Sequence, residues 1–188
     1  MTDVPDIRIR LADPERDAAA VADIYRPAVE ETIASFEAEA PDAAEMARRI
    51  SATLERTPWL VAQVDETVIG YAYAGPHRER AGYRWSVDVS AYVHPDWHGR
   101  RVGRALYDEL IPLLRRQRFV NVYAGIALPN PASVALHESI GMRRIGVYQQ
   151  VGWKPAGGWI DVAWFGMRIA EPSQPPAEPV PLFQVAGN

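Results

Sequence analysis

The chain has 188 residues, a formal net charge of −4 and no cysteine. This length suits one domain with a hydrophobic core, the acidic balance argues against a nucleic-acid-binding protein, and the lack of cysteine excludes disulfides and cysteine catalysis. No window approaches the roughly 18 consecutive apolar residues of a membrane span, and the acidic start MTDVPDIRIR lacks the apolar core of an export signal, so we expect a cytoplasmic protein.

Local patterns predict one strand, two helices and three further strands in the first half of the chain. Asp13 before Pro14 is typical of a helix N-cap, and Asp42 followed by Glu45 resembles a capping box. Alternating apolar residues and the turn at 65–67 predict a hairpin followed by a long strand. The predicted strands cover residues 7–11, 59–64, 68–73 and 83–93, and the second helix ends near Leu54.

The second half is predicted to alternate helices and strands before a proline-rich end. A helix over 100–117 contains Pro112, which we expect to kink it, and a helix over 131–140 begins after Asn130 and closes at Gly141. The remaining predicted strands are 120–126, 144–151 and 159–168. The later segment EPSQPPAEPVPLF cannot form regular helix or sheet, so we expect it to lie extended across the surface or to be mobile.

This order of elements predicts an α/β fold with a mixed sheet and helices on both faces. The helix after the long strand acts as a crossover to the next strand and therefore predicts one parallel pair. We expect a single domain over residues 1–170 and a proline-rich tail over residues 171–188.

The segment Val89–Leu106, VSAYVHPDWHGRRVGRAL, predicts an anion site. It places a short Pro/Gly/Arg turn between a strand end and an amphipathic helix, where the first backbone N–H groups have no partner and the helix dipole favours negative charge. Arginines at this point can add charge-assisted bonds to phosphate. A pyrophosphate there would belong to a nucleotide-type cofactor; the alternative is an exposed basic helix start.

Asp88 is a carboxylate in the middle of an apolar strand. Strand alternation puts Asp88, Ser90 and Tyr92 on one face and valines on the other. Desolvation there raises the pKa of a carboxyl, so Asp88 is a candidate general base; the alternative is a buried structural Asp bonded to nearby hydroxyls. The spacing of His94 and His98 also fits a zinc pair on one helical turn, but Pro95 between them and the lack of a third ligand argue against a metal.

The order of elements and several motifs resemble the GNAT acetyltransferases, and among them the phosphinothricin N-acetyltransferase branch. The motifs are HGRRVGRAL at 98–106, YAYAGP at 71–76, RAGYRWSVDVSAYV at 80–93, LPNPASVALHESIGM at 128–142 and GGWIDVAWF at 157–165. The resemblance covers roughly residues 7 to 182 and implies a GNAT fold with about seven strands and four helices. It also implies transfer of acetyl from acetyl-CoA to the α-amine of phosphinothricin, methionine sulfoximine or methionine sulfone, without a metal, in a homodimer, with herbicide resistance as a consequence.

The resemblance assigns the CoA diphosphate to the loop His98–Gly103. The chain departs from the family pattern at His98, where Gln or Arg is usual, and at Arg101, where the first glycine is usual. We expect the amide cradle to survive if Arg101 adopts a helical φ. The cofactor residues implied are Tyr92, Val93, His98, Gly99, Arg100, Arg101, Val102, Gly103, Arg104, Asn130 and Ser133.

The resemblance also assigns the catalytic groups and the acceptor site. Asp88 falls on the family's glutamate base position but is one methylene shorter, a backbone amide near Tyr92 or Val93 binds the thioester oxygen, and His137 protonates the thiolate or binds the acceptor. The acceptor candidates are Phe36, Tyr73, Arg78, Arg80, Tyr83, Tyr92, Tyr107 and Val162. Alternatives to this function are a non-catalytic acyl-CoA-binding module and an acetyltransferase for another small amine or a protein N-terminus.

Overall fold

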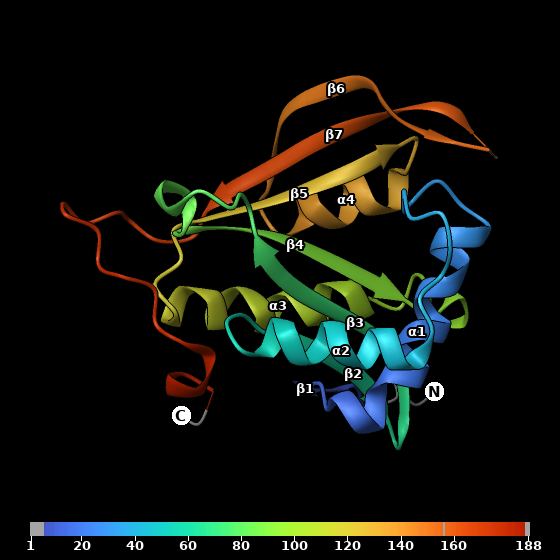
Figure 1. Cartoon of the computed structure of the whole chain (residues 1–188), viewed down its shortest axis with the longest axis horizontal. Coiled ribbons are helices and arrows are strands. Elements are labelled where there is room, and N and C mark those ends of the chain that lie inside the picture. The colour runs from blue at the N-terminus through green and yellow to red at the C-terminus, as the bar shows by residue number, and fades with distance from the viewer. Residues whose placement is uncertain (1–5, 156, 187–188) are drawn as a thin grey trace, which may run out of the picture.

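A computed structural model describes residues 6–155 and 157–186, which form one seven-stranded sheet with four α-helices (Figure 1). The strands are β1 (Arg8–Leu11), β2 (Trp59–Val64), β3 (Thr67–Pro76), β4 (Ser86–Val93), β5 (Asn121–Leu128), β6 (Arg143–Lys154) and β7 (Gly158–Arg168). The helices are α1 (Pro14–Glu30), α2 (Ala43–Leu54), α3 (Val102–Arg116) and α4 (Pro131–Ser139). Short 3-10 helices lie at Ala81–Tyr83, Pro95–Trp97 and Leu182–Gln184.

Three of the helices begin at the polar residues that the sequence predicts. The side chain of Asp13 accepts the N–H groups of Glu15 and Arg16, and that of Asp42 accepts the N–H of Glu45. Asn130 does the same for Ser133 at the start of α4. These oxygens satisfy amides that have no partner within the first turn, which fixes where each helix starts.

The sheet has the order β1-β2-β3-β4-β5-β7-β6. The predicted parallel pair is confirmed: β4 and β5 run parallel, from Ser86 opposite Asn121 to Asp88 opposite Tyr123. The other neighbours are antiparallel. Beyond Asp88 the two strands part, and β5 turns away with β7 and β6, so the sheet opens like a V (Figure 1).

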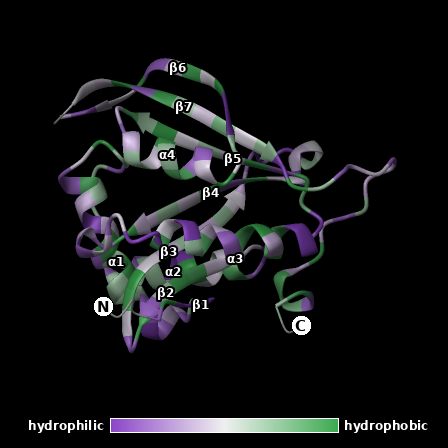
Figure 2. Cartoon of the chain, turned by 180° about the vertical axis from the view of Figure 1, so that it is seen from behind, coloured by the Kyte–Doolittle hydropathy of each residue, from purple (hydrophilic) through white to green (hydrophobic). Residues whose placement is uncertain are grey.

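Helices cover both faces of the sheet, as predicted. One core cluster joins α1 and α2 to Trp59, Val61 and Tyr71 on the sheet. The other joins α3, together with α4, to the opposite face around Val87 and Val89. Hydrophobic residues gather where the sheet meets the helices, whereas the outer strand β6 carries hydrophilic segments beside hydrophobic ones (Figure 2).

Two predicted boundaries are wrong for tertiary reasons. The long strand begins at Ser86 and not at Tyr83, which lies in a 3-10 helix. The carbonyl of Trp85 accepts N–H groups from Val120 and Asn121 instead of joining β3. Helix α3 begins at Val102 and not at Arg100, because Arg101 adopts a left-handed backbone conformation.

The proline-rich tail lies extended across the surface, which is one of the two arrangements expected for it. The Trp85 indole N–H donates to the Ala177 carbonyl at 2.8 Å, and Val180 N–H donates to the Gln117 carbonyl at 3.0 Å. Leu182 at the end of the tail is buried. Among the described helices, none has the length and apolar character that a membrane crossing requires.

Candidate active site

The divergence of β4 and β5 opens a cleft of about 910 Å³. Its walls are residues 89–93 of β4 and residues 124–127 of β5. The N-terminal ends of α3 and α4 line one end, and the last turn of α1 with residues 31–34 lines the other. The cleft therefore joins an anion-binding end to an end bounded by the loop after α1.

The free edge of β4 turns backbone N–H groups toward this cleft. His94 N–H donates to Ile69 of β3, so residues at alternate positions, Ala91 and Val93, direct their N–H groups toward β5. The pairing with β5 ends at Asp88, which leaves these amides without a strand partner. An amide at this position can donate to a carbonyl or oxyanion in the cleft.

The loop before α3 forms an amide cradle, but not in the way expected from the sequence. Arg101 has φ 62° and ψ 16°, so the helical φ expected for it is wrong. Gly99 also has a positive φ, of 74°. This turn directs the first N–H groups of α3 toward the cleft end, and the family's usual glycine at position 101 fits the same left-handed conformation without cost.

The arginines of this loop do not all face the cleft. Arg101 and Arg104 line it, whereas the guanidinium of Arg100 lies 4.8 Å from the ring centre of Trp97 and does not line the cleft. Arg104 bonds to Asp108 and to the Ser139 carbonyl, each at 2.8 Å. His98 donates from Nε2 to the Val93 carbonyl at 2.9 Å, which ties the loop to the end of β4.

The start of α4 completes the anion-binding end. Asn130, Ser133 and the other expected cofactor residues Tyr92, Val93, Gly99, Val102 and Gly103 line the cleft. A Cβ at Gly103 would lie 2.9 Å from the Leu136 side chain, so glycine allows α3 and α4 to approach closely. Two helix N-termini and two arginines at one cleft end fit a diphosphate.

Asp88 has a partner that the sequence did not indicate. Its Oδ1 lies 2.6 Å from Nδ1 of His77, in place of the hydroxyls considered from the sequence. Burial raises the pKa of Asp88, as expected, while the hydrogen bond and charge of His77 and the charge of Arg78 act in the opposite direction. No local sequence signal joins His77 to Asp88, because their contact depends on how the loop between β3 and β4 folds back.

His137 lines the cleft from α4, but its ring nitrogens already have partners. Nδ1 donates to the Ser133 carbonyl at 2.7 Å, and Nε2 lies 3.1 Å from the Tyr107 hydroxyl. Burial lowers the pKa of His137, which favours the neutral ring. To protonate a thiolate or bind an acceptor, the ring must first exchange one of these bonds.

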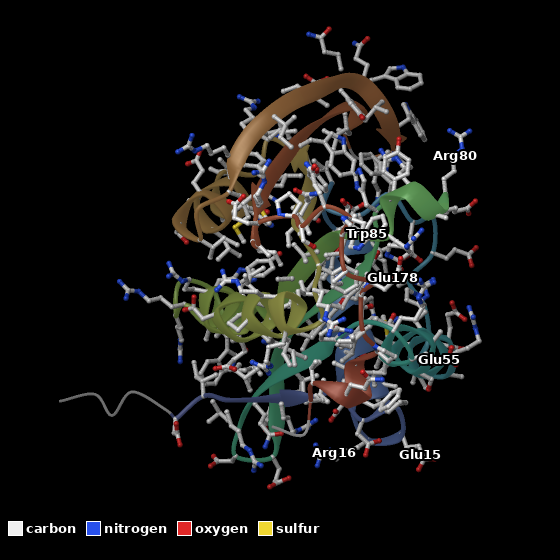
Figure 3. The ribbon with its side chains drawn as sticks, turned by 90° about the vertical axis from the view of Figure 1, so that its left-hand side faces the viewer. Glu15, Arg16, Glu55, Arg80, Trp85 and Glu178 are labelled. Atoms are coloured by element: carbon white, nitrogen blue, oxygen red, sulfur yellow. The ribbon has the colours of Figure 1, made fainter. Side chains whose placement is uncertain are left out.

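Most of the expected acceptor residues lie around the face of the sheet that carries Asp88. Phe36 packs on Gly152, and Tyr73 stacks on Trp59. Tyr83 meets the His77 ring edge-on, and the Arg78 guanidinium lies over Trp164. Val162 lies on the same side, next to Gly125 of the cleft wall. Arg80 extends from the surface into solvent (Figure 3). Tyr107 is buried against His137 and does not line the cleft.

His94 and His98, the two histidines considered as a zinc pair, bond to the backbone. In the described part of the chain, no three His, Cys, Asp or Glu side chains come together as metal ligands. Nδ1 of His94 accepts the N–H of Asp96 in a local turn, while Nε2 of His98 donates to Val93. The two histidine side chains therefore stabilise the backbone of this loop through hydrogen bonds.

Comparisons with known proteins agree with this geometry. The Acetyltransferase (GNAT) domain family matches residues 9–164. The phosphinothricin N-acetyltransferase of Streptomyces viridochromogenes is 37% identical over 169 residues, covering 90% of this chain and 91% of that protein. The L-methionine sulfoximine/L-methionine sulfone acetyltransferase of Salmonella typhimurium is 36% identical over 170 residues, covering 90% of this chain and 98% of that protein.

Solved structures give the same family. The GNAT superfamily phosphinothricin acetyltransferase of Sinorhizobium meliloti, in complex with AcCoA, superposes with a TM-score of 0.84 at 33% identity, covering 93% of each chain. Acetyl-CoA is accordingly the cofactor of this fold, and the cleft residues described above are suited to hold it.

Proposed function

The chain belongs to the GNAT acetyltransferase family, and on that premise we propose that it acetylates the α-amine of phosphinothricin or of a related analogue such as methionine sulfoximine or methionine sulfone. The observation that carries the proposal is the position of Asp88 at the vertex of the V, on the strand whose next residues line the acetyl-CoA cleft. Two relatives that match 90% of this chain are named as acetyltransferases of these compounds.

The reaction proposed is direct attack in a ternary complex. The diphosphate of acetyl-CoA binds the first amides of α3 with Arg101 and Arg104, and Asn130 and Ser133 contact the cofactor beside them. The thioester lies along the free edge of β4, where the amide of Val93 donates to its oxygen. An amine attacks only when neutral, so the base function built on Asp88 removes its proton. His137 serves the thiolate or the acceptor after releasing one of its present bonds.

The acceptor is proposed to bind on the Asp88 face. Phe36 and Val162 supply apolar walls, and Tyr73 and Tyr83 add hydroxyl groups. The guanidinium of Arg78 suits a carboxylate or phosphinate. The solvent-facing Arg80, two residues further along the chain, adds a second positive charge.

A second copy is proposed to pair through the last strands. Five exposed large apolar residues lie on β6 and β7: Ile145, Tyr148, Val151, Trp153 and Trp159. Exposed apolar side chains gathered on neighbouring strands indicate an interface. Light scattering should give twice the monomer mass, and Trp159→Lys should give the monomer mass.

The experiment is thiol release from acetyl-CoA, followed with a thiol-reactive dye, because a chain without cysteine contributes no background. The acceptors are phosphinothricin, methionine sulfoximine, methionine sulfone, glutamate and a short peptide. Saturable turnover on the first three, lowered roughly 100-fold or more in Asp88→Asn, is expected from loss of the base. Turnover on the peptide alone would favour a protein N-terminus as acceptor, and acetyl-CoA binding with no turnover would favour a binding module.

A further inference from the structure

His77 and Asp88 form a pair at the point where β4 and β5 separate. Nδ1 of His77 lies 2.6 Å from Oδ1 of Asp88, and the imidazole ring packs against Tyr123 with ring centres 4.5 Å apart. Trp164 and Tyr83 meet the same ring edge-on, at 6.0 and 6.2 Å. The imidazole is thus held on four sides by side chains from β4, β5, β7 and the 3-10 helix.

The pair lies next to residues that line the cleft. Asp88 is two residues before Ser90, and Tyr123 is two residues before Gly125; both Ser90 and Gly125 line the cleft. Residues two apart on a strand share a face and lie about 7 Å apart. His77 and Asp88 do not themselves line the cleft, but the pair stands at the vertex of the V, next to Ser90 and Gly125, which do.

The hydrogen bonds leave one ring nitrogen of His77 free. Asp88 is a carboxylate and accepts from Nδ1–H, which puts the lone pair of the neutral ring on Nε2. Within the described residues, Nε2 makes no hydrogen bond and is not among the buried unpartnered polar atoms. A base oriented by a carboxylate in this way is the arrangement that activates nucleophiles in many enzymes.

We propose that His77, oriented by Asp88, accepts the proton of the acceptor amine through Nε2, directly or through one water. This inference rests on the proposed function and names the atom that carries out its base step. A base nitrogen on His77 makes up for an aspartate side chain that is one methylene shorter than glutamate. Asp88 is then a positioning residue that fixes the ring and stabilises it once it is protonated.

The step balances without any further reactant. The protonated amine first gives one proton to Nε2 of His77, which passes it to solvent. The neutral nitrogen then forms a bond to the acetyl carbon, and its second proton passes to the same Nε2. The C–S bond then breaks, the thiolate takes up a proton to leave as CoA thiol, and His77 returns its proton to solvent. The groups around His77 that carry charge or titrate are Asp88, Arg78, Tyr83 and Tyr123.

The test compares His77→Asn with His77→Gln in the full chain. The Asn amide can donate to Asp88 from the position of Nδ1, so it keeps the carboxylate in place but supplies no base. With phosphinothricin or methionine sulfoximine as acceptor, kcat should fall roughly 100-fold or more in both variants. The Kd of acetyl-CoA, measured by calorimetry on the same samples, should stay within about twofold.

The pH dependence of kcat separates a base from a structural residue. An imidazole base gives kcat an acid limb, because its protonated form cannot accept a proton, so His77→Asn should lose that limb and its residual kcat should vary little with pH. His77→Asn combined with Asp88→Asn should be no slower than His77→Asn alone, because the pair acts as a unit.

A kcat of His77→Asn within threefold of wild type would overturn the proposal while leaving the acetyltransferase function intact. The same would follow from an unchanged acid limb in that variant. If the wild-type protein turned over none of the acceptor amines, the proposed function itself would fail. If His77→Asn does not bind acetyl-CoA, the same kinetic comparison is made between His77→Gln and wild type.

Discussion

The ring of Phe36 lies directly on the backbone of Gly152. A Cβ built at Gly152 would collide with three ring atoms of Phe36, so only glycine lets the loop after α1 rest on β6. Ile33 of the same loop meets Gly157, which lies in the turn between β6 and β7. The loop therefore spans from α1 to the β6–β7 hairpin and closes the acceptor end of the cleft (Figure 1).

Gly152→Ala should displace Phe36 and weaken acceptor binding. We expect the KM of the acceptor to rise roughly fivefold, equivalent to about 1 kcal/mol of lost apolar contact, with the KM of acetyl-CoA unchanged. Gly146→Ala is the matched control, because it lies on the same strand and a Cβ there meets no atom within 4 Å. Equal kinetics in the two variants would show that Phe36 does not contact the acceptor.

Arg101→Gly should relieve backbone strain. A residue with a Cβ at φ 62° costs roughly 1–2 kcal/mol, and the greater freedom of glycine in the unfolded chain offsets part of the gain. We expect the free energy of unfolding to rise by about 0.5–1 kcal/mol in urea titrations. The KM of acetyl-CoA should rise roughly threefold, because one partly exposed charge near the diphosphate is lost.

Arg118→Gly provides the comparison for this variant. Arg118 also has a positive φ, of 70°, but it lies at the far end of α3 and does not line the cleft. It should show the gain in stability without the change in the KM of acetyl-CoA. A destabilised Arg101→Gly would mean that the loop relies on the Arg101 side chain more than on its backbone conformation.

Local chemistry accounts for the parts of the fold that the sequence predicts well. The caps at Asp13, Asp42 and Asn130 act on amides within three residues, so each helix start is visible in a short window. The parallel pair follows from one crossover helix. The anion-binding loop and the start of α3 are predictable for the same reason, since they are contiguous in sequence.

The remaining features depend on contacts between distant segments. The left-handed conformation of Arg101 is set by how the loop closes, and an arginine gives no local sign of it. The strand β4 starts late because Trp85 bonds to residues 120, 121 and 177. The contact between His77 and Asp88 needs the register in which Pro76 lies opposite Val87, and periodicity alone does not give register.

Asp17 should make stability depend on acidic pH. Burial alone would raise its pKa, but hydrogen bonds from Arg10, at 2.6 and 2.7 Å, and from the Asp13 N–H outweigh burial, so the pKa of Asp17 lies below its ordinary value. The folded state therefore favours the ionised form. Its stabilising contribution is complete above the ordinary pKa of an unfolded aspartate and is lost as the pH falls through the lower folded value.

Asp17→Asn tests this contribution. It leaves Arg10 without its charge partner in a buried site, so we expect a loss of roughly 3 kcal/mol at pH 7. The difference from wild type should shrink below about pH 4, measured by urea unfolding across pH. Asp23→Asn on the same helix should change little, because Asp23 is exposed and its pair with Arg26 is on the surface. A pH-independent difference would assign the effect to packing.

The proline-rich tail should be part of the cooperative folding unit, although its sequence predicts a separate segment. Leu182 is 4% exposed and Phe183 beside it is 77% exposed, so the two residues form a matched pair. Leu182→Ala should cost roughly 2–3 kcal/mol through the cavity it leaves, and Phe183→Ala should cost almost nothing. In a thermal scan the Leu182→Ala protein should melt in one transition at a lower temperature, because the tail bonds to Gln117 at the end of α3 and to Trp85 before β4. An unchanged main transition would instead mean that the tail detaches before the core unfolds, and residues 1–170 would then be the complete domain.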